Sequence, residues 1–135
     1  MLGKDARIGA CLLAGNMDVM VRFYRDTLGL RTSWNGGSFA EFETASGELS
    51  FFLYSRESFV QAIGEPYEPP RGINQTCEIA FWLPSFADVD AAYQRLSKLG
   101  LRFPTGAPKT YDFGIRNFYL ADPEGNLLES GSIQR

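Results

Sequence analysis

The chemistry open to this 135-residue chain is limited first by a residue type that it lacks, because the sequence contains no histidine. Histidine is the usual proton shuttle near neutral pH and the commonest protein ligand of transition metals. Acid–base or metal chemistry must therefore rest on other groups, chiefly the 16 aspartate and glutamate residues. The cysteines Cys11 and Cys77 show no C-x-x-C spacing and are too few for a disulfide framework. We expect free thiols in a reducing compartment, although a single bridge between them stays open.

The charge and hydropathy of the chain argue against two classes of partner. Its net charge is −3, its pI is about 4.9, and its 13 lysine and arginine residues are scattered along the chain. This distribution offers no basic patch to a phosphate backbone, so we expect no nucleic-acid partner. The longest apolar stretch, residues 8–15, is too short to span a bilayer, and no convincing signal-peptide pattern surrounds it. The sequence predicts one cytoplasmic domain over residues 1–135, with no membrane partner.

A short internal repeat indicates that the chain contains two similar modules. Leu28-Gly29-Leu30-Arg31 recurs as Leu99-Gly100-Leu101-Arg102, and each copy closes a segment of helical periodicity. The first segment begins at Asn16, a favourable N-cap residue, and the second begins near Asp88. In each segment the glycine of the repeat is expected to end the helix.

Strand-like segments surround each predicted helix. One apolar run precedes each helix, and three segments separated by turn residues follow it. The separating turns include Asn35-Gly36-Gly37, Ser46-Gly47 and Asp122-Pro123-Glu124-Gly125. The expected strands are residues 8–13, 30–34, 38–42 and 49–54 in the first half, and 77–83, 101–103, 115–121 and 126–130 in the second.

These elements predict an α+β fold. Module one spans about residues 6–55, and module two spans about residues 76–133. A proline-rich linker, about residues 56–75, joins them and opens with a short helix at 57–63. We expect two tandem βαβββ modules to form a curved, mixed β-sheet that bears a cleft and carries helices on its outer face, with the modules paired either within one chain or across a dimer. Ligands favour such concave sites.

Two motifs give the chain a resemblance to a known superfamily. They are Phe23-Tyr24-Arg25-Asp26-Thr27-Leu28-Gly29-Leu30 and Asp122-Pro123-Glu124-Gly125-Asn126-Leu127-Leu128-Glu129, with Ile79-Ala80-Phe81 between them. Together they resemble the vicinal oxygen chelate superfamily, which includes glyoxalase I, extradiol dioxygenases and the bleomycin and fosfomycin resistance proteins. The resemblance covers about residues 7–133 and implies the glyoxalase/bleomycin resistance fold and a homodimer. Because that fold hosts many chemistries, the resemblance alone assigns no activity.

The resemblance also implies where metal ligands would stand. In metal-dependent members, four ligands come from the first and last strands of each module, and the matching positions here are Gly9, Phe52, Glu78 and Glu129. Gly9 and Phe52 cannot bind a metal, which leaves two carboxylates where a catalytic ion usually has about three protein ligands. We therefore expect no metal or other cofactor. A weak Mg²⁺ or Mn²⁺ site completed by water or substrate stays open.

Glu78 and Glu129 are the candidate catalytic residues. Their strands are neighbours in the fold that the resemblance implies, so the two carboxylates would share a partly desolvated pocket. Repulsion would raise one pKa, and the pair could act as acid and base or hold a cationic ligand. The alternative is that both are carboxylates at strand ends in solvent.

Strand alternation predicts aromatic walls for the cleft. Arg116 is a further candidate for the cleft, because sequences of the superfamily that this chain resembles often keep a Gly-x-Arg motif beside the pocket. The alternatives are ordinary core packing for the aromatic residues and a surface ion pair for the arginine. The candidate ligand-binding residues are Trp34, Phe52, Tyr54, Trp82 and Arg116.

The leading hypothesis is a metal-independent protein that binds a small planar or cationic molecule between aromatic faces and carboxylates. It is similar in style to the bleomycin resistance proteins. One alternative is a lyase, isomerase or dioxygenase of the glyoxalase type that uses Glu78 and Glu129 as acid and base or as weak metal ligands. Another is a regulatory or interaction module whose cleft is filled by its own side chains, with Phe52 as the plug.

Overall fold

The structure is a computed structural model that describes residues 2–45 and 49–134. The chain divides into two compact units after Glu68. The predicted linker is shared between them, because residues 56–68 belong to the first unit and residues 69–75 to the second. The expected turn Ser46-Gly47 lies outside the described residues.

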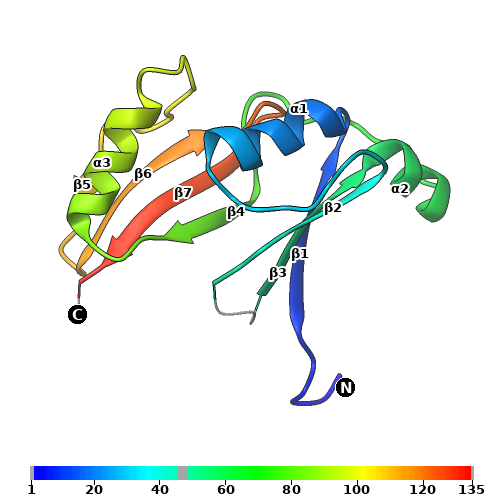
Figure 1. Cartoon of the computed structure of the whole chain (residues 1–135), viewed down its shortest axis with the longest axis horizontal. Helices are drawn as coiled ribbons and strands as arrows, with labels where there is room; N and C mark the ends of the chain where they lie inside the picture. The colour runs from blue at the N-terminus through cyan, green and yellow to red at the C-terminus, as the bar shows by residue number, and fades with distance from the viewer. Residues whose placement is uncertain (1, 46–48, 135) are drawn as a thin grey trace. The chain divides into compact units, whose positions relative to one another are not determined.

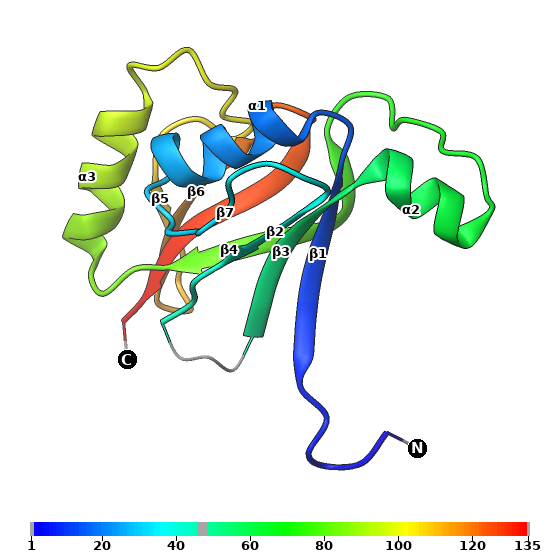
Figure 2. The ribbon, with the colours of Figure 1, turned by 45° about the vertical axis from the view of Figure 1, so that its right-hand side comes forward.

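The first unit is a three-stranded sheet with two helices and a π-helical turn. Its strand order is β1-β3-β2, with β1 parallel to β3 and β2 antiparallel to β3 (Figures 1 and 2). A parallel pair needs a crossover connection, and the helical segment after β1 supplies it. The elements are β1 (Ile8–Ala14), α1 (Met17–Arg22), η1 (Phe23–Thr27), β2 (Phe39–Phe42), β3 (Leu49–Ser55) and α2 (Arg56–Ile63).

The second unit is a four-stranded sheet with one helix. Its strand order is β4-β7-β6-β5, and again the first and last strands of the unit are parallel neighbours. Helix α3 packs on β6 and β7, as Figure 1 shows. The elements are β4 (Asn74–Trp82), α3 (Phe86–Leu96), β5 (Lys109–Thr110), β6 (Ile115–Ala121) and β7 (Asn126–Ile133).

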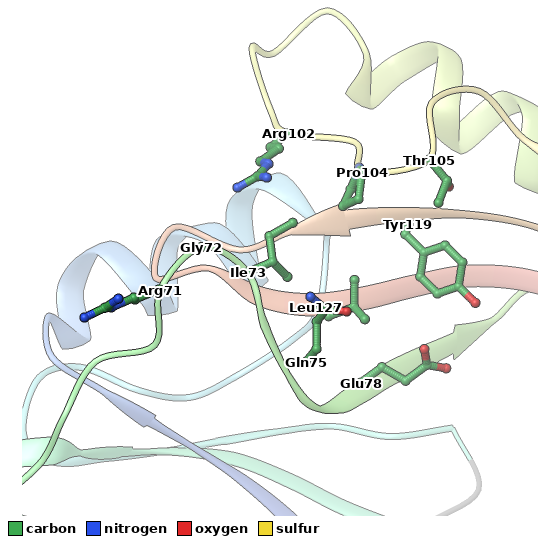
Figure 3. Close-up of a pocket in the computed structure, with 10 residues that line it drawn as sticks. All are labelled: Arg71, Gly72, Ile73, Gln75, Glu78, Arg102, Pro104, Thr105, Tyr119 and Leu127. Atoms are coloured by element: carbon green, nitrogen blue, oxygen red, sulfur yellow. The ribbon is translucent and has the colours of Figure 1, made fainter.

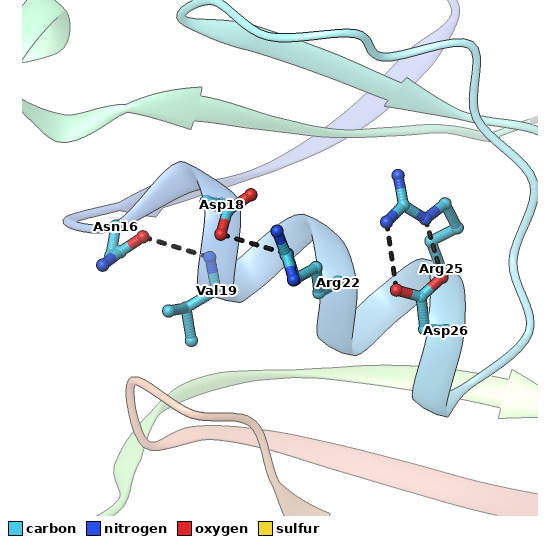
Figure 4. Close-up of polar contacts among 6 residues, drawn as sticks. All are labelled: Asn16, Asp18, Val19, Arg22, Arg25 and Asp26. Carbon is cyan, nitrogen blue, oxygen red and sulfur yellow. Dashed lines mark hydrogen bonds and ion pairs between the residues drawn. The ribbon is translucent and has the colours of Figure 1, made fainter.

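The first helix begins where the sequence predicts. The Asn16 side chain accepts a hydrogen bond from the Val19 amide at 3.0 Å, which satisfies one of the free N–H groups of the first turn (Figure 4). The helix continues as the π-helical turn, in which the Leu28 amide donates to the Phe23 carbonyl. Gly29 then adopts a φ of 82°, a left-handed conformation that favours glycine and ends the helix.

The second helix begins earlier than predicted. Its N-cap is Ser85, whose hydroxyl oxygen accepts from the Asp88 amide at 3.1 Å, so Asp88 lies in the first turn and is not the start. The Ser85 hydroxyl also donates to the Asp88 carboxylate at 2.6 Å. This reciprocal pair resembles a capping box and explains the two-residue difference.

Two of the predicted strands are wrong. The structure describes residues 30–34 and 101–103, but neither segment pairs with a neighbouring strand in a ladder. Each makes one backbone bond to a neighbouring strand end, from the Glu43 amide to the Arg31 carbonyl and from the Ala121 amide to the Arg102 carbonyl. A single bond does not propagate a ladder. The second unit recovers its βαβββ order through β5, whereas the first unit has three strands among its described residues.

Each unit has its own apolar core between helix and sheet. In the first unit, the Tyr24 ring lies edge-on to Phe51 at 5.2 Å between centroids, and Leu53 is fully buried. In the second unit, Val89 of α3 and Phe118 of β6 are fully buried. Burial of such side chains supplies the main favourable free energy of folding. The α+β fold class predicted from the sequence is confirmed.

Within the part of the chain that the structure describes, no helix combines the length and apolar character needed to cross a bilayer.

Replacing Leu53 by alanine should lower the free energy of unfolding by about 2–5 kcal/mol, because the cavity lies in a core that cannot collapse fully. Leu49→Ala on the same strand is the matched control, since Leu49 is 41% exposed. Urea denaturation measures both. Equal losses for the two variants would contradict the burial of Leu53 in the core of the first unit.

Candidate functional site

The open face of the second sheet, opposite α3, carries a cluster of polar side chains. Glu129 of β7 is directly opposite Tyr119 of β6 and Ala80 of β4, and Glu78 is the diagonal neighbour two pairs earlier on the same face. Alternation along β6 places Asn117 on the same face as Tyr119. We call Glu78, Glu129, Asn117 and Tyr119 the acidic cluster.

A β-bulge positions Glu78. The register of β4 against β7 shifts between Asn74, which pairs with Asn126, and Glu78, which pairs with Leu127. The three extra residues leave the ladder, and the Asn74 side chain accepts from the Thr76 amide at 3.1 Å. Bulges of this kind re-aim the side chains that follow them. Glu78 is thereby brought beside Glu129 on the open face.

The two glutamates share a hydrogen bond and have different exposures. Glu129 is buried, with 5% of its surface exposed, and its Oε2 accepts from the Asn117 side-chain amide at 2.7 Å. Glu78 is exposed. A hydrogen bond that the protonated Glu78 carboxyl donates to Glu129, followed by desolvation and the negative charge of Glu129, raises the pKa of Glu78 to about 7. When the Glu78 carboxyl keeps its proton, two like charges on neighbouring strands are avoided.

The other members of the cluster add polar atoms around this pair. Desolvation, and then the charges of Glu129 and Glu78, raise the pKa of the Tyr119 phenol. The Oδ1 atom of Asn117 is buried and has no hydrogen-bond partner among the described residues. A buried acceptor without a donor is rare in folded proteins. None of the lysines and arginines in the described ranges forms an ion pair with either glutamate.

A pocket of about 490 Å³ adjoins the cluster, and Glu78 and Tyr119 line it. Its volume lies in the range of small-molecule sites. Figure 3 shows the Tyr119 hydroxyl on the same side of the pocket as the Glu78 carboxylate. The remaining walls come from the segment before β4, the start of β4, the segment after α3 and the start of β7. They are Arg71, Gly72, Ile73, Gln75, Arg102, Pro104, Thr105 and Leu127.

The first unit carries a separate, apolar pocket of about 560 Å³ on its own sheet. Phe52 and Tyr54 of β3 line it, as strand alternation predicts, and the Phe39 ring lies 5.2 Å from that of Phe52. The other lining residues are Cys11, Leu13 and Phe59. Desolvation raises the pKa of the Cys11 thiol, which fits the interpretation of Cys11 as a small apolar residue. Both cysteines are free thiols.

The two units place their corresponding residues in the same register. Gly9 pairs with the residue two positions before Phe52, just as Glu78 pairs with the residue two positions before Glu129. A Cβ atom on Gly9 would lie 3.3 Å from Cε1 of Phe52, so the phenyl ring stands beside the space where a Gly9 side chain would begin. Phe52 lines its pocket and leaves a cavity, which argues against Phe52 as a plug.

The structure does not bring the other predicted ligand residues to the acidic cluster as a group. Trp82 lies on the same face, is 52% exposed, and its ring covers Gly131 next to Glu129 on that face. Trp34 lies in the first unit, where its indole N–H donates to the Gly37 carbonyl, and it lines neither pocket.

The expectation that Arg116 lies beside the pocket is wrong. It alternates onto the face of β6 that α3 covers, where its guanidinium pairs with Asp90 at 2.7 Å and donates to the Thr110 hydroxyl at 2.9 Å. The ion pair that the sequence left as the alternative is therefore present. The Gly-x-Arg pattern does not reveal which face of the strand the arginine occupies, whereas alternation with buried Phe118 does.

The donor set fits a catalytic metal poorly. No group of three or more Cys, Asp or Glu side chains that could hold an ion occurs within residues 2–45 and 49–134. The acidic cluster supplies two carboxylates, one of which shares a proton with the other, and a phenol. Catalytic ions usually have about three protein ligands. Metal independence stays a prediction, and the steps considered below use protein groups alone.

Comparison with known proteins relates the chain to a superfamily. The sequence model of the Glyoxalase/Bleomycin resistance protein/Dioxygenase superfamily matches residues 7–130. YraH of Bacillus subtilis (strain 168), described as an uncharacterized protein, is 30% identical over 120 residues, which are 87% of this chain and 91% of YraH.

Solved structures show the same fold. The glyoxalase/bleomycin resistance protein/dioxygenase from Nocardioides is 26% identical with a TM-score of 0.79, over all of this chain and 87% of that one. The lactoylglutathione lyase from Agrobacterium tumefaciens is 23% identical with a TM-score of 0.72, over 96% of this chain and 95% of that one. The second likeness concerns the fold alone.

The raised pKa of Glu78 makes stability depend on pH. The folded state binds more protons than the unfolded state between the ordinary glutamate value of 4.5 and about 7, so the free energy of unfolding falls as pH rises through this window. The stability of Glu78→Gln relative to the unmodified chain should therefore be higher at about pH 8 than at about pH 5. Because Glu78 is exposed, we expect less than about 1 kcal/mol.

Thermal unfolding at both pH values measures this difference, and Glu68→Gln in the first unit is the control for loss of one carboxylate. If the Glu78 variant and the control shift equally with pH, the two glutamates do not interact.

Proposed function

The chain belongs to the glyoxalase, bleomycin resistance protein and dioxygenase superfamily, and we propose that it binds a small, planar cation at the acidic cluster. One observation carries the proposal: two carboxylates are held together on an open sheet face without a cation from the described residues to balance them. A ligand ammonium would replace the shared proton and relieve the repulsion. Charge-assisted hydrogen bonds of this kind are about twice as strong as neutral ones.

The surroundings of the pair suit a cation with an attached ring. Asn117 donates to Glu129 at 2.7 Å and so holds that carboxylate in place. Exposed Trp82 and half-buried Tyr119 present aromatic surface on the same face. Aromatic faces attract cations and stack with planar ligands. Binding through these groups requires no metal.

Benzylamine is a suitable probe because it is planar and carries one ammonium group. In a Trp34→Phe variant only Trp82 reports by indole fluorescence, so a saturable change on titration locates binding to the second unit. Glu78→Gln and Glu129→Gln should each weaken binding about tenfold through loss of a charged hydrogen bond. Benzyl alcohol, which lacks the charge, is the matched ligand control.

Addition of a chelator should leave benzylamine binding unchanged. The proposal fails if fluorescence and calorimetry show no saturable binding up to millimolar benzylamine, or if benzyl alcohol binds equally well. Ligand binding by Phe52 and Tyr54 in the pocket of the first unit stays a prediction. Homodimer formation also stays a prediction.

A second candidate function is proton transfer in a lyase or isomerase reaction. The observation that favours it is the hydrogen-bonded carboxyl pair, because a carboxyl whose pKa is about 7 can donate and accept protons near neutral pH. Glu78 would act as acid or base on a substrate in the adjoining pocket, and Glu129 would stabilise each protonation state. Full activity of a Glu129→Gln enzyme on any substrate so identified would remove this candidate.

A further inference from the structure

The pocket beside the acidic cluster contains two arginines that the acid–base pair does not use. Arg71 lies before β4, and Arg102 lies in the segment after α3. Neither guanidinium has a hydrogen bond or an ion pair to any residue in the described ranges. In contrast, Arg116 is fixed by Asp90. Two unpaired cations at one pocket form an anion-binding end.

The opposite charges of the pocket lie at its two ends. Figure 3 shows Arg71 and Arg102 toward one end and the Glu78 carboxylate with the Tyr119 hydroxyl toward the other. No ion pair joins either arginine to Glu78 in this part of the chain. The charges therefore do not neutralise each other, and both ends are open to a ligand.

The middle of the pocket is apolar. Ile73, Leu127 and Pro104 lie between the charged ends in Figure 3. A ligand that spans the pocket would place hydrocarbon against these side chains, and burial of that surface is favourable. The volume of about 490 Å³ holds a molecule of the size of a substituted benzene with two polar ends.

We propose that the ligand of this pocket is a small zwitterion, with an ammonium group at Glu78 and Glu129, an apolar spacer, and a carboxylate at Arg71 and Arg102. The inference rests on the proposed function, because it adds an anionic group to the cation already assigned. A monoanionic carboxylate suits the site better than a phosphate dianion, since the nearby glutamates penalise extra negative charge.

The test compares ligands that differ in one charged group. Calorimetry on the full chain measures benzylamine, 4-(aminomethyl)benzoate and 4-methylbenzoate, with hexylamine and 6-aminohexanoate as a flexible pair that adapts to the length of the pocket. At least one zwitterion should bind about fivefold more tightly than the amine of the same skeleton, since exposed ion pairs contribute modestly. The carboxylate alone should bind more weakly than either.

An Arg71→Gln/Arg102→Gln double variant should lose the fivefold gain, so that each zwitterion binds no more tightly than the amine of the same skeleton. Arg95→Gln is the matched control, because Arg95 is exposed in the last turn of α3 and lines neither pocket. It should keep the gain.

The outcomes separate the two proposals. If the amines bind but neither zwitterion binds more tightly, or if the gain survives in the double variant, the zwitterion inference is overturned and the cation-binding function stands. If neither amine binds, the proposed function fails, and the inference that depends on it fails too.

Discussion

The repulsion between two carboxylates on neighbouring strands is the constraint on which the candidate site of this protein depends. Glu129 is buried and its hydrogen bond to Asn117 fixes one oxygen, so its position is set by β6 and β7. The position of Glu78 is set by the bulge of β4, and Glu78 is more exposed than Glu129. A proton held between the two carboxyls lets both remain in contact. In the proposed function, a ligand ammonium takes the place of that proton at a site that the fold has already built.

The duplicated architecture explains why this constraint occurs in one unit only. Both units pair their first and last strands in parallel and in the same register, so each brings one pair of diagonal residues together. In the second unit that pair is Glu78 and Glu129. In the first unit it is Gly9 and Phe52, neither of which is titratable, and Phe52 lines an apolar pocket. The same backbone geometry therefore carries two different chemistries, set by the residues at four positions.

Much of the fold follows from local signals in the sequence. Asn16 caps the first helix and Gly29 ends it, and the repeated Leu-Gly-Leu-Arg segments place Arg31 and Arg102 in corresponding positions, each accepting one backbone bond from a strand end. The strands expected around these two arginines did not form, because ladder pairing depends on the partner strand and not on local propensity.

The candidate site was predictable in part. The positions of Glu78 and Glu129 follow from the family motifs, and alternation along residues 115–121 could have added Asn117 and Tyr119. The bulge before Glu78 and the approach of Arg71 and Arg102 to one pocket could not be predicted, since both depend on contacts between distant segments. Arg116 is the opposite case. The Gly-x-Arg motif predicted a pocket residue, whereas strand alternation places Arg116 on the face of β6 that α3 covers.

The most direct test of the central interaction is a pH titration of the glutamate side-chain carboxyl carbons by NMR, assigned with the Glu78→Gln and Glu129→Gln variants. The carboxyl pair should show a titration step with an apparent pKa near 7, and either substitution should abolish it. If both carboxyls instead titrate near the ordinary value of 4.5 and neither substitution affects the other, the two glutamates do not form the pair described.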